Sequence, residues 1–271
     1  GGSVTTTGAQ SYGEAITFGT ATTLTASNVT FANTVTGSNS LRVVGPSTLN
    51  GGAVTTTGAQ SYSGAVTLGV DTVLEAGSSN ITLSATVDSA TSTAKALTLN
   101  STGTTTLNGA VGGTTALASL ITNAGGMVLV NTSTVHTSGA QTFNDRVSVM
   151  GDATFTASQI TFNAAVMGAG SLSLVGDVSL NGGRVTSAGT QSYSGTVNLM
   201  RDTLIDAGAG DITFHSTVDG AYALTLNNSG TSTLGGAVGD TTALTSLSTN
   251  TGGSMAINGA RVTTTGGQTY N

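Results

Sequence analysis

The sequence predicts an all-β chain folded as a right-handed parallel β-helix, a solenoid in which each coil stacks on the one before it. Three observations lead to this prediction: a long internal repeat, a strand-forming composition, and short apolar runs separated by turn residues. We expect one solenoid over residues 1–271, with about ten coils of three short strands and roughly 25 to 27 residues per coil.

The repeat is the strongest of the three signals. The segment Val-Thr-Thr-Thr-Gly-Ala-Gln-Ser-Tyr at 4–12 returns with small changes at 54–62, 135–143, 185–193 and 262–270. The chain therefore divides into units of two lengths: short 1–50, long 51–131, short 132–181, long 182–258, and 259–271 as the start of another. The two long units differ in length by four residues at one place, where 88–97 matches 219–224, which predicts a surface turn of variable length.

Short apolar runs place the strands of the first unit. They are 4–5, 15–18, 23–24, 29–31, 41–44 and 48–49, and the long unit repeats them and adds a block over 106–130. With three strands to a coil, a short unit would hold two coils and a long unit three. A solenoid accepts units of two lengths because each coil contacts only its neighbours, whereas a propeller needs equal blades and hairpin signals for a sandwich are rare.

Residue types within the runs predict which side chains face inward. In 81–83 (Ile-Thr-Leu) and 212–214 (Ile-Thr-Phe) the apolar residues are expected inside and threonine outside. An asparagine closes each unit, and we expect it to take the left-handed backbone of a turn and to stack on other asparagines. These residues are Asn50, Asn131, Asn181 and Asn258.

The composition excludes several classes of protein. Only 7% of the residues are charged and 40 are glycine, while Thr, Ser, Asn and Gly disfavour helices. Hydrophobic residues make up 37%, enough to argue against disorder. A net charge of −6 without a basic patch argues against nucleic-acid binding, and no apolar run is long enough to insert into a membrane. The chain has no cysteine, so no disulfide framework is possible, and an export signal would lie elsewhere.

The repeat style resembles that of the filamentous-haemagglutinin-like adhesins. The likeness rests on Val-Thr-Thr-Thr-Gly-Ala-Gln-Ser-Tyr followed by Gly-Ala-Val-Thr-Leu-Gly, and on Gly-Ala-Val-Gly-Gly-Thr-Thr-Ala-Leu at 109–117 with a near copy at 236–244. This resemblance implies a right-handed parallel β-helix shaft of a two-partner-secreted bacterial surface protein, located outside the cell and acting in adhesion or biofilm matrix. The family's amino-terminal secretion domain is not in this sequence.

The acidic residues and the histidines are the candidates for a catalytic site. Asp202, Asp206 and Asp211 form the densest acidic group, but Asp202 matches Asp71 by the repeat and Asp219 likewise matches Asp88. Such residues belong to the repeat rather than to one unique cleft. His136 and His215 have no partner at metal-site or triad spacing and are expected to face solvent. We therefore expect no enzyme activity, no catalytic or metal-binding residues and no cofactor; calcium at isolated turns stays open.

The Gln-x-Tyr motif admits two interpretations. Glutamine beside an exposed aromatic ring can bind a sugar, whereas a turn that packs its ring against the solenoid would be structural. The phenylalanine in one copy favours packing. The motif comprises Gln10, Tyr12, Gln60, Tyr62, Gln141, Phe143, Gln191, Tyr193, Gln268 and Tyr270.

Two functions are consistent with the sequence. The first is a structural or adhesive fibre segment of a long bacterial cell-surface or extracellular-matrix protein. The second is a glycan-binding or glycan-cleaving β-helix. Residues 259–271 restart the repeat, so we expect further copies of it as partners, either in a continuing chain or in an end-to-end filament, with surface glycans as candidate ligands.

Overall fold

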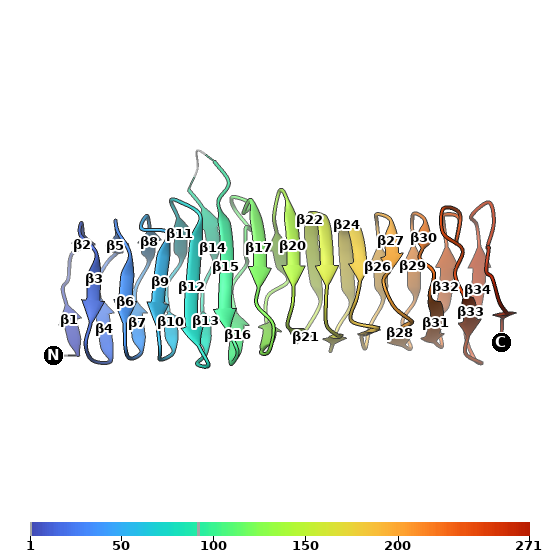
Figure 1. The fold of residues 1–271 in the computed structure, drawn as a ribbon, viewed down its shortest axis with the longest axis horizontal. Helices are drawn as coiled ribbons and strands as arrows, with labels where there is room; N and C mark the ends of the chain where they lie inside the picture. Colours follow the sequence, from blue (N-terminus) through green and yellow to red (C-terminus); the bar gives the residue numbers. More distant parts are fainter. Residues whose placement is uncertain (1, 91–92) are drawn as a thin grey trace. The chain divides into compact units, whose positions relative to one another are not determined.

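The structure, a computed structural model, describes residues 2–90 and 93–271. All regular structure in this part of the chain is β-strand, and the strands pair in parallel from coil to coil, so the predicted all-β solenoid is confirmed (Figure 1). The chain forms two compact units, 1–139 (unit 1) and 140–271 (unit 2).

In unit 1 the chain winds through three parallel sheets, with one strand of each sheet to a coil. Sheet A of unit 1 contains β1 (Ser3–Thr5), β4 (Thr22–Thr25), β7 (Leu41–Val44), β10 (Gln60–Tyr62), β13 (Ile81–Leu83), β16 (Thr104–Leu107) and β18 (Met127–Val130). Sheet B of unit 1 contains β2 (Gln10–Tyr12), β5 (Val29–Phe31), β8 (Ser47–Leu49), β11 (Val66–Leu68) and β14 (Val87–Ser89), and single bridges through Val111 extend it to β19 (Thr134–His136). Sheet C of unit 1 contains β3 (Ile16–Phe18), β6 (Val35–Gly37), β9 (Ala53–Thr56), β12 (Thr72–Gly77), β15 (Ala96–Ser101) and β17 (Ser119–Thr122).

Unit 2 has the same winding. Its sheet A contains β21 (Arg146–Val149), β23 (Val166–Gly168), β25 (Arg184–Thr186), β28 (Thr203–Gly208), β31 (Ala223–Asn228), β33 (Ser246–Thr249) and β35 (Gln268–Thr269). Two long strands, β22 (Ala153–Phe162) and β24 (Leu172–Leu180), run through sheets B and C and are irregular where the two sheets meet. Sheet B continues with β26 (Gln191–Tyr193), β29 (Ile212–Phe214), β32 (Thr231–Leu234) and β34 (Ser254–Ile257), while sheet C also contains β20 (Ala140–Phe143), β27 (Val197–Leu199) and β30 (Val218–Asp219).

The interior is built from columns of side chains at one register position. In sheet A of unit 1 such a column runs Leu24, Val43, Tyr62, Leu83 and Leu107, all of them buried. The predicted alternation holds in both copies: in β13 and β29 the first and last residues are buried, and the threonine between them is only half-buried. Because neighbouring coils place apolar atoms on apolar atoms, the thin core stays continuous within each unit.

The predicted coil length is wrong, because most coils are shorter. Val29 already pairs with Ser47 in the next coil, and the expected length is reached only where Thr72 pairs with Leu97. The described residues accordingly make about 13 turns instead of ten. The cause is two strands of the first short unit, β2 and β6, that are missing from its predicted apolar runs. β2 has the polar sequence Gln-Ser-Tyr, because a glutamine takes one of its inward positions, and β6 ends in glycine. Neither strand therefore stands out as an apolar run.

The repeat and the coil therefore have different lengths. The first short unit, 1–50, contains β1 to β8, which is two coils and two further strands, whereas two coils alone were expected. As a result, equivalent residues fall on different sheets. Within unit 1, Gln10 lies in sheet B and Gln60 in sheet A.

The variable turn falls where expected, between β14 and β15 in unit 1 and between β30 and β31 in unit 2. Residues 91–92 of the longer copy lie outside the described residues. At its end, the Lys95 backbone N–H donates to the Ser89 hydroxyl (2.8 Å).

Candidate functional site

The Gln-x-Tyr motif is the first candidate, and the structure places it in strands rather than turns. Four copies lie entirely within a strand, namely β2, β10, β20 and β26. In the fifth copy Gln268 begins β35 and Tyr270 directly follows it. The rings of Tyr62, Phe143 and Tyr193 are fully buried in the interior. The prediction that the motif is a turn is therefore wrong, because these rings pack from strands into the interior. Tyr12 is half-buried and only Tyr270 is exposed.

The glutamine amide joins three strands inside the solenoid. Gln60 Nε2 donates to the Val54 carbonyl (2.9 Å), the Thr56 hydroxyl (3.2 Å) and the Glu75 carbonyl (2.7 Å). The Tyr62 hydroxyl then donates to Gln60 Oε1 (3.1 Å). This network satisfies both ends of an amide that is completely buried, which is the condition for keeping a polar group in an apolar core.

The other copies of the motif repeat this arrangement. The tyrosine hydroxyl donates to the glutamine oxygen two residues earlier in the pairs 12/10 (3.0 Å), 193/191 (2.7 Å) and 270/268 (2.9 Å). Gln141 donates to the Thr156 carbonyl (2.9 Å) although position 143 is phenylalanine. Where the next coil supplies a phenylalanine, the rings stack: Tyr12 on Phe31, Phe143 on Phe162 and Tyr193 on Phe214, at centroid distances of 5.7, 5.3 and 4.8 Å.

Burial also fixes the protonation state of the motif. Desolvation raises the pKa of the Tyr62 and Tyr193 phenols far above the ordinary value, so both remain neutral donors to their glutamines. A ring enclosed in the core cannot contact a sugar on the surface. In the three buried copies the geometry therefore supports a role in holding coils together.

The aspartates are the second candidate, and most of them accept hydrogen bonds from the following coil. Asp88 Oδ1 accepts from the backbone N–H groups of Thr114 (2.8 Å) and Thr115 (3.0 Å). Asp219, its repeat equivalent, accepts from Thr241 (2.9 Å) and Thr242 (3.1 Å). We call these residues coil clips. The other clips are Asp71 to Ala96, Asp152 to Ser171, Asp177 to Thr196, Asp202 to Ala223 and Asp211 to Thr231.

The three aspartates of unit 2 that form the densest acidic group, Asp202, Asp206 and Asp211, each accept a backbone hydrogen bond. Asp202 and Asp211 are clips, and Asp206 accepts from the N–H of Gly208 (3.0 Å) at the end of its own strand, β28. Among the described residues no three His, Cys, Asp or Glu side chains are grouped as metal ligands.

The two histidines lie one in each unit. His215 is exposed, as expected, and its Nε2 lies 3.2 Å from the Ser192 hydroxyl on the neighbouring strand. His136 is half-buried in β19.

The unit-ending asparagines stack in two of the four cases. Asn181 donates to Asn163, which donates to Asn144 (2.6 Å), and Asn131 donates to Asn108 (2.6 Å). The expected left-handed backbone is not found at these residues, because every described positive φ belongs to glycine. After Asn50 and Asn181 that conformation falls two residues later, at Gly52 (φ 77°) and Gly183 (φ 71°), since glycine adopts it without a Cβ clash.

Sequence reasoning missed a third set of residues. Arg146, Arg184 and Arg201 all lie in unit 2, and none of them has a charged counterpart at the aligned position of unit 1. Aligning the two copies position by position would have revealed them.

A comparison of the chain with known proteins found no matching family model, no matching characterised protein and no matching solved structure. In the described part of the chain, no helix has the length and apolar character required to span a bilayer.

Proposed function

We propose that this chain is a stiff segment of a long, extracellular bacterial surface or matrix fibre that acts in adhesion or biofilm. The observation that carries the proposal is the repeated use of polar side chains to bond each coil to the next. Asp71 and Asp202, equivalent positions of the two long units, make the same bond (both 2.9 Å), and so do Asp88 and Asp219.

Such bonds suit a load-bearing element. In a solenoid each coil contacts only its neighbours, so stability is a sum over coil interfaces and an unclipped interface is the weakest point. Backbone ladders, interior Gln–Tyr pairs and coil clips contribute at successive interfaces. The repeat style shared with filamentous-haemagglutinin-like adhesins adds support for the location and role.

The outer surface supplies a means of adhesion. In sheet B of unit 1, Ser11, Thr30, Thr48 and Thr67 occupy one register position on successive strands, so their hydroxyls form a continuous row. A row of groups that both donate and accept hydrogen bonds suits hydrated polar surfaces such as glycans or matrix polymers.

The test is adhesion of beads coated with the full chain to epithelial cells and to extracted biofilm matrix. We expect the native chain to hold the beads and a triple variant, Thr30→Val, Thr48→Val and Thr67→Val, to hold fewer. Matched substitutions at Thr106, Thr82 and Thr23 on sheet A control for the loss of hydroxyls alone. Equal adhesion of native chain and uncoated beads would refute the adhesive role.

The glycan-cleaving alternative is tested separately. Incubation with extracted matrix polysaccharides should release no more reducing ends than a heat-denatured sample. Release above that control would replace the fibre proposal with an enzymatic one.

A further inference from the structure

The internal repeat offers a comparison within one chain. Residues 132–208 align with 1–77 without a gap, at a shift of 131. At six aligned positions a small or neutral residue of the first copy becomes arginine or methionine in the second. These are Arg146 for Ala15, Met150 for Gly19, Met167 for Thr36, Arg184 for Ala53, Met200 for Gly69 and Arg201 for Val70.

The structure gathers the core of this set on sheet A of unit 2. β21, β23 and β25 are adjacent, with Val147 paired to Val166 and Val166 to Val185. Arg146 and Arg184 therefore share one register position on the two outer strands, about 10 Å apart. Met167, 38% exposed, projects from the strand between them.

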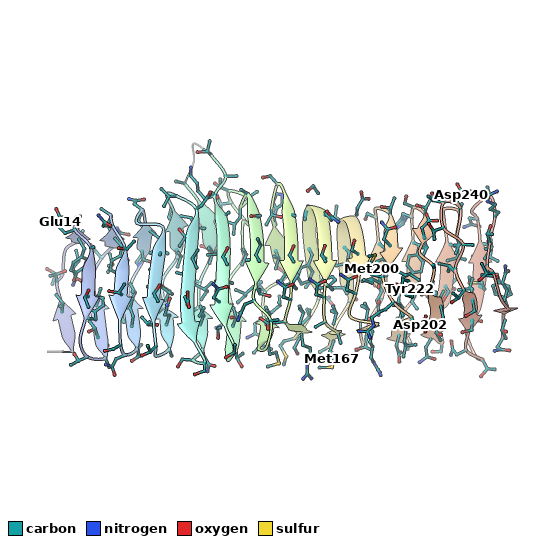
Figure 2. The ribbon with its side chains drawn as sticks, viewed as in Figure 1. Glu14, Met167, Met200, Asp202, Tyr222 and Asp240 are labelled. Atoms are coloured by element: carbon teal, nitrogen blue, oxygen red, sulfur yellow. The ribbon has the colours of Figure 1, made fainter. Side chains whose placement is uncertain are left out.

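Arg201 joins the same surface from the turn before β28. Its Cδ lies 3.1 Å from the place where a Cβ on Gly183 would be, so its side chain crosses the chain just before Arg184. Met200, 54% exposed, precedes it, and Figure 2 labels both Met167 and Met200. The only ion pair of the described residues joins Arg261 to Asp240, so these three arginines have no carboxylate partner there.

The next strand of the same sheet carries the opposite charge. β28 pairs with β25, and Asp206 lies opposite Thr186 while Leu204 lies opposite Arg184. Asp202 stands in the turn beside Arg201. Residues 202–240 contain five aspartates and no lysine or arginine. Of these five only Asp206 lies on a strand of sheet A, so that sheet carries Arg146 and Arg184 up to β25 and a single carboxylate on β28.

We propose that two copies of this chain pair side by side and antiparallel through sheet A of unit 2. A two-fold axis parallel to the strands, between β25 and β28, places Arg184 of one copy across from Leu204 of the other, so its long side chain points toward Asp206 two residues along that strand; the reverse contact follows by symmetry. The same pairing covers the exposed methionines, which are flexible enough to pack at an interface.

A second copy fits this surface better than an anionic polymer does. A polyanion lying along the sheet would meet Arg146 and Arg184 and then run onto Asp206 and Asp202. An antiparallel copy presents acidic groups to the basic strands and basic groups to the acidic ones. The pairing does not depend on the proposed adhesive function and can fail or hold independently of it.

The test is the molar mass of the full chain in solution, measured by sedimentation equilibrium at low and high salt. We expect a dimer that dissociates as salt rises, because screening weakens exposed charge pairs. Arg184→Asp or Asp206→Arg alone should weaken association about tenfold or more, and the two combined should restore it. Arg42→Asp, which changes the charge of unit 1 by the same amount, should leave the dimer unchanged.

Circular dichroism of each variant verifies that the solenoid is still folded. A chain that stays monomeric at every concentration and salt would overturn the proposal. So would a double variant that remains as weak as either single one. If Arg184→Asp abolishes binding to an anionic polysaccharide such as alginate while the molar mass does not change, the surface is a glycan site and the pairing is refuted.

Discussion

At the scale of single residues, the interior of this protein is not purely apolar. Gln60 is completely buried and has all of its amide groups bonded, three acceptors at Nε2 and the Tyr62 hydroxyl at Oε1. The Gln-x-Tyr motif, which suggests a surface ligand site, thus bonds neighbouring strands to one another inside the solenoid. The sequence could identify the residues that recur but not their direction, because Gln and Tyr share one face of the strand and Ser the other, and either face of so polar a strand could point inward.

Tyr62→Phe should lower the free energy of unfolding by about 1–2 kcal/mol, because it leaves the buried Gln60 oxygen without its donor. Chemical denaturation followed by circular dichroism measures the effect. Tyr270→Phe is the matched control: it removes the same bond to Gln268 at an exposed site and should cost less than about 0.5 kcal/mol. Equal losses in the two variants would contradict the buried-joint interpretation.

Alkaline pH should also destabilise the fold through Tyr62 and Tyr193. Burial raises the pKa of both phenols, whereas in the unfolded chain a tyrosine ionises near about pH 10. Below that pH the phenols are neutral in both states and the stability is fully present. Above it the unfolded state loses protons first, so stability falls as the pH rises toward the folded-state pKa.

Denaturation midpoints measured from about pH 8 to pH 11 check this expectation. The double variant Tyr62→Phe with Tyr193→Phe should show a shallower decline. A decline of the same slope would assign the alkaline sensitivity to other groups.

At the scale of strands and turns, each coil is attached to the next by a backbone ladder on the sheets and by side chains at the corners. The coil clips are aspartates that lie within or next to short strands and accept N–H groups about one coil later. Their recurrence was visible in the sequence for Asp71 with Asp202 and Asp88 with Asp219. Their bonding was not visible, because the acceptor and donor are separated by about one coil and the coil length was unknown.

Asp88→Ala should cost about 1–2 kcal/mol, since it leaves two backbone donors without their shared acceptor. Asp88→Asn keeps an oxygen at that place and should cost less. Glu75→Gln is the control, because it removes the same charge at an exposed position of β12. Thermal melts of the three variants would rank them; a Glu75→Gln loss equal to that of Asp88→Ala would point to net charge instead of the clip.

At the scale of the whole molecule, the number of residues in one coil differs from the number of residues in one sequence repeat. The short unit is a unit of duplication, whereas the coil is set by its short strands and by the turns that join them. Each repeat therefore starts on a different sheet from the one before it. An outward-facing residue that recurs in every repeat therefore appears on several sheets. A residue that occurs in only one repeat appears on one sheet.

Removing one coil should be tolerated only if the register is kept. Deletion of residues 35–53 joins Thr34 to Val54, which occupies the register position of Val35 one coil further on. We expect that variant to keep its strand content and a cooperative melt. Deletion of 35–59, which is the coil length the sequence first suggested, should lose both because the strands after it fall on the wrong sheets. Circular dichroism of the two variants decides between the coil lengths, and equal tolerance would refute the observed register.

The sequence by itself determined the class of fold, the parallel stacking and the inward residues of strands such as Ile81-Thr82-Leu83, because alternation and repetition are local properties of the chain. The tertiary structure alone decided the coil length, the interior position of the Gln-x-Tyr motif, the bonds of the aspartates and the grouping of Arg146, Arg184 and Arg201. Each of these depends on which residue lies one coil away, and that neighbour is fixed by the sum of strand and turn lengths around the whole coil. Because two strands of the first short unit were not predicted, the predicted coil was too long, and every predicted neighbour one coil away was therefore wrong.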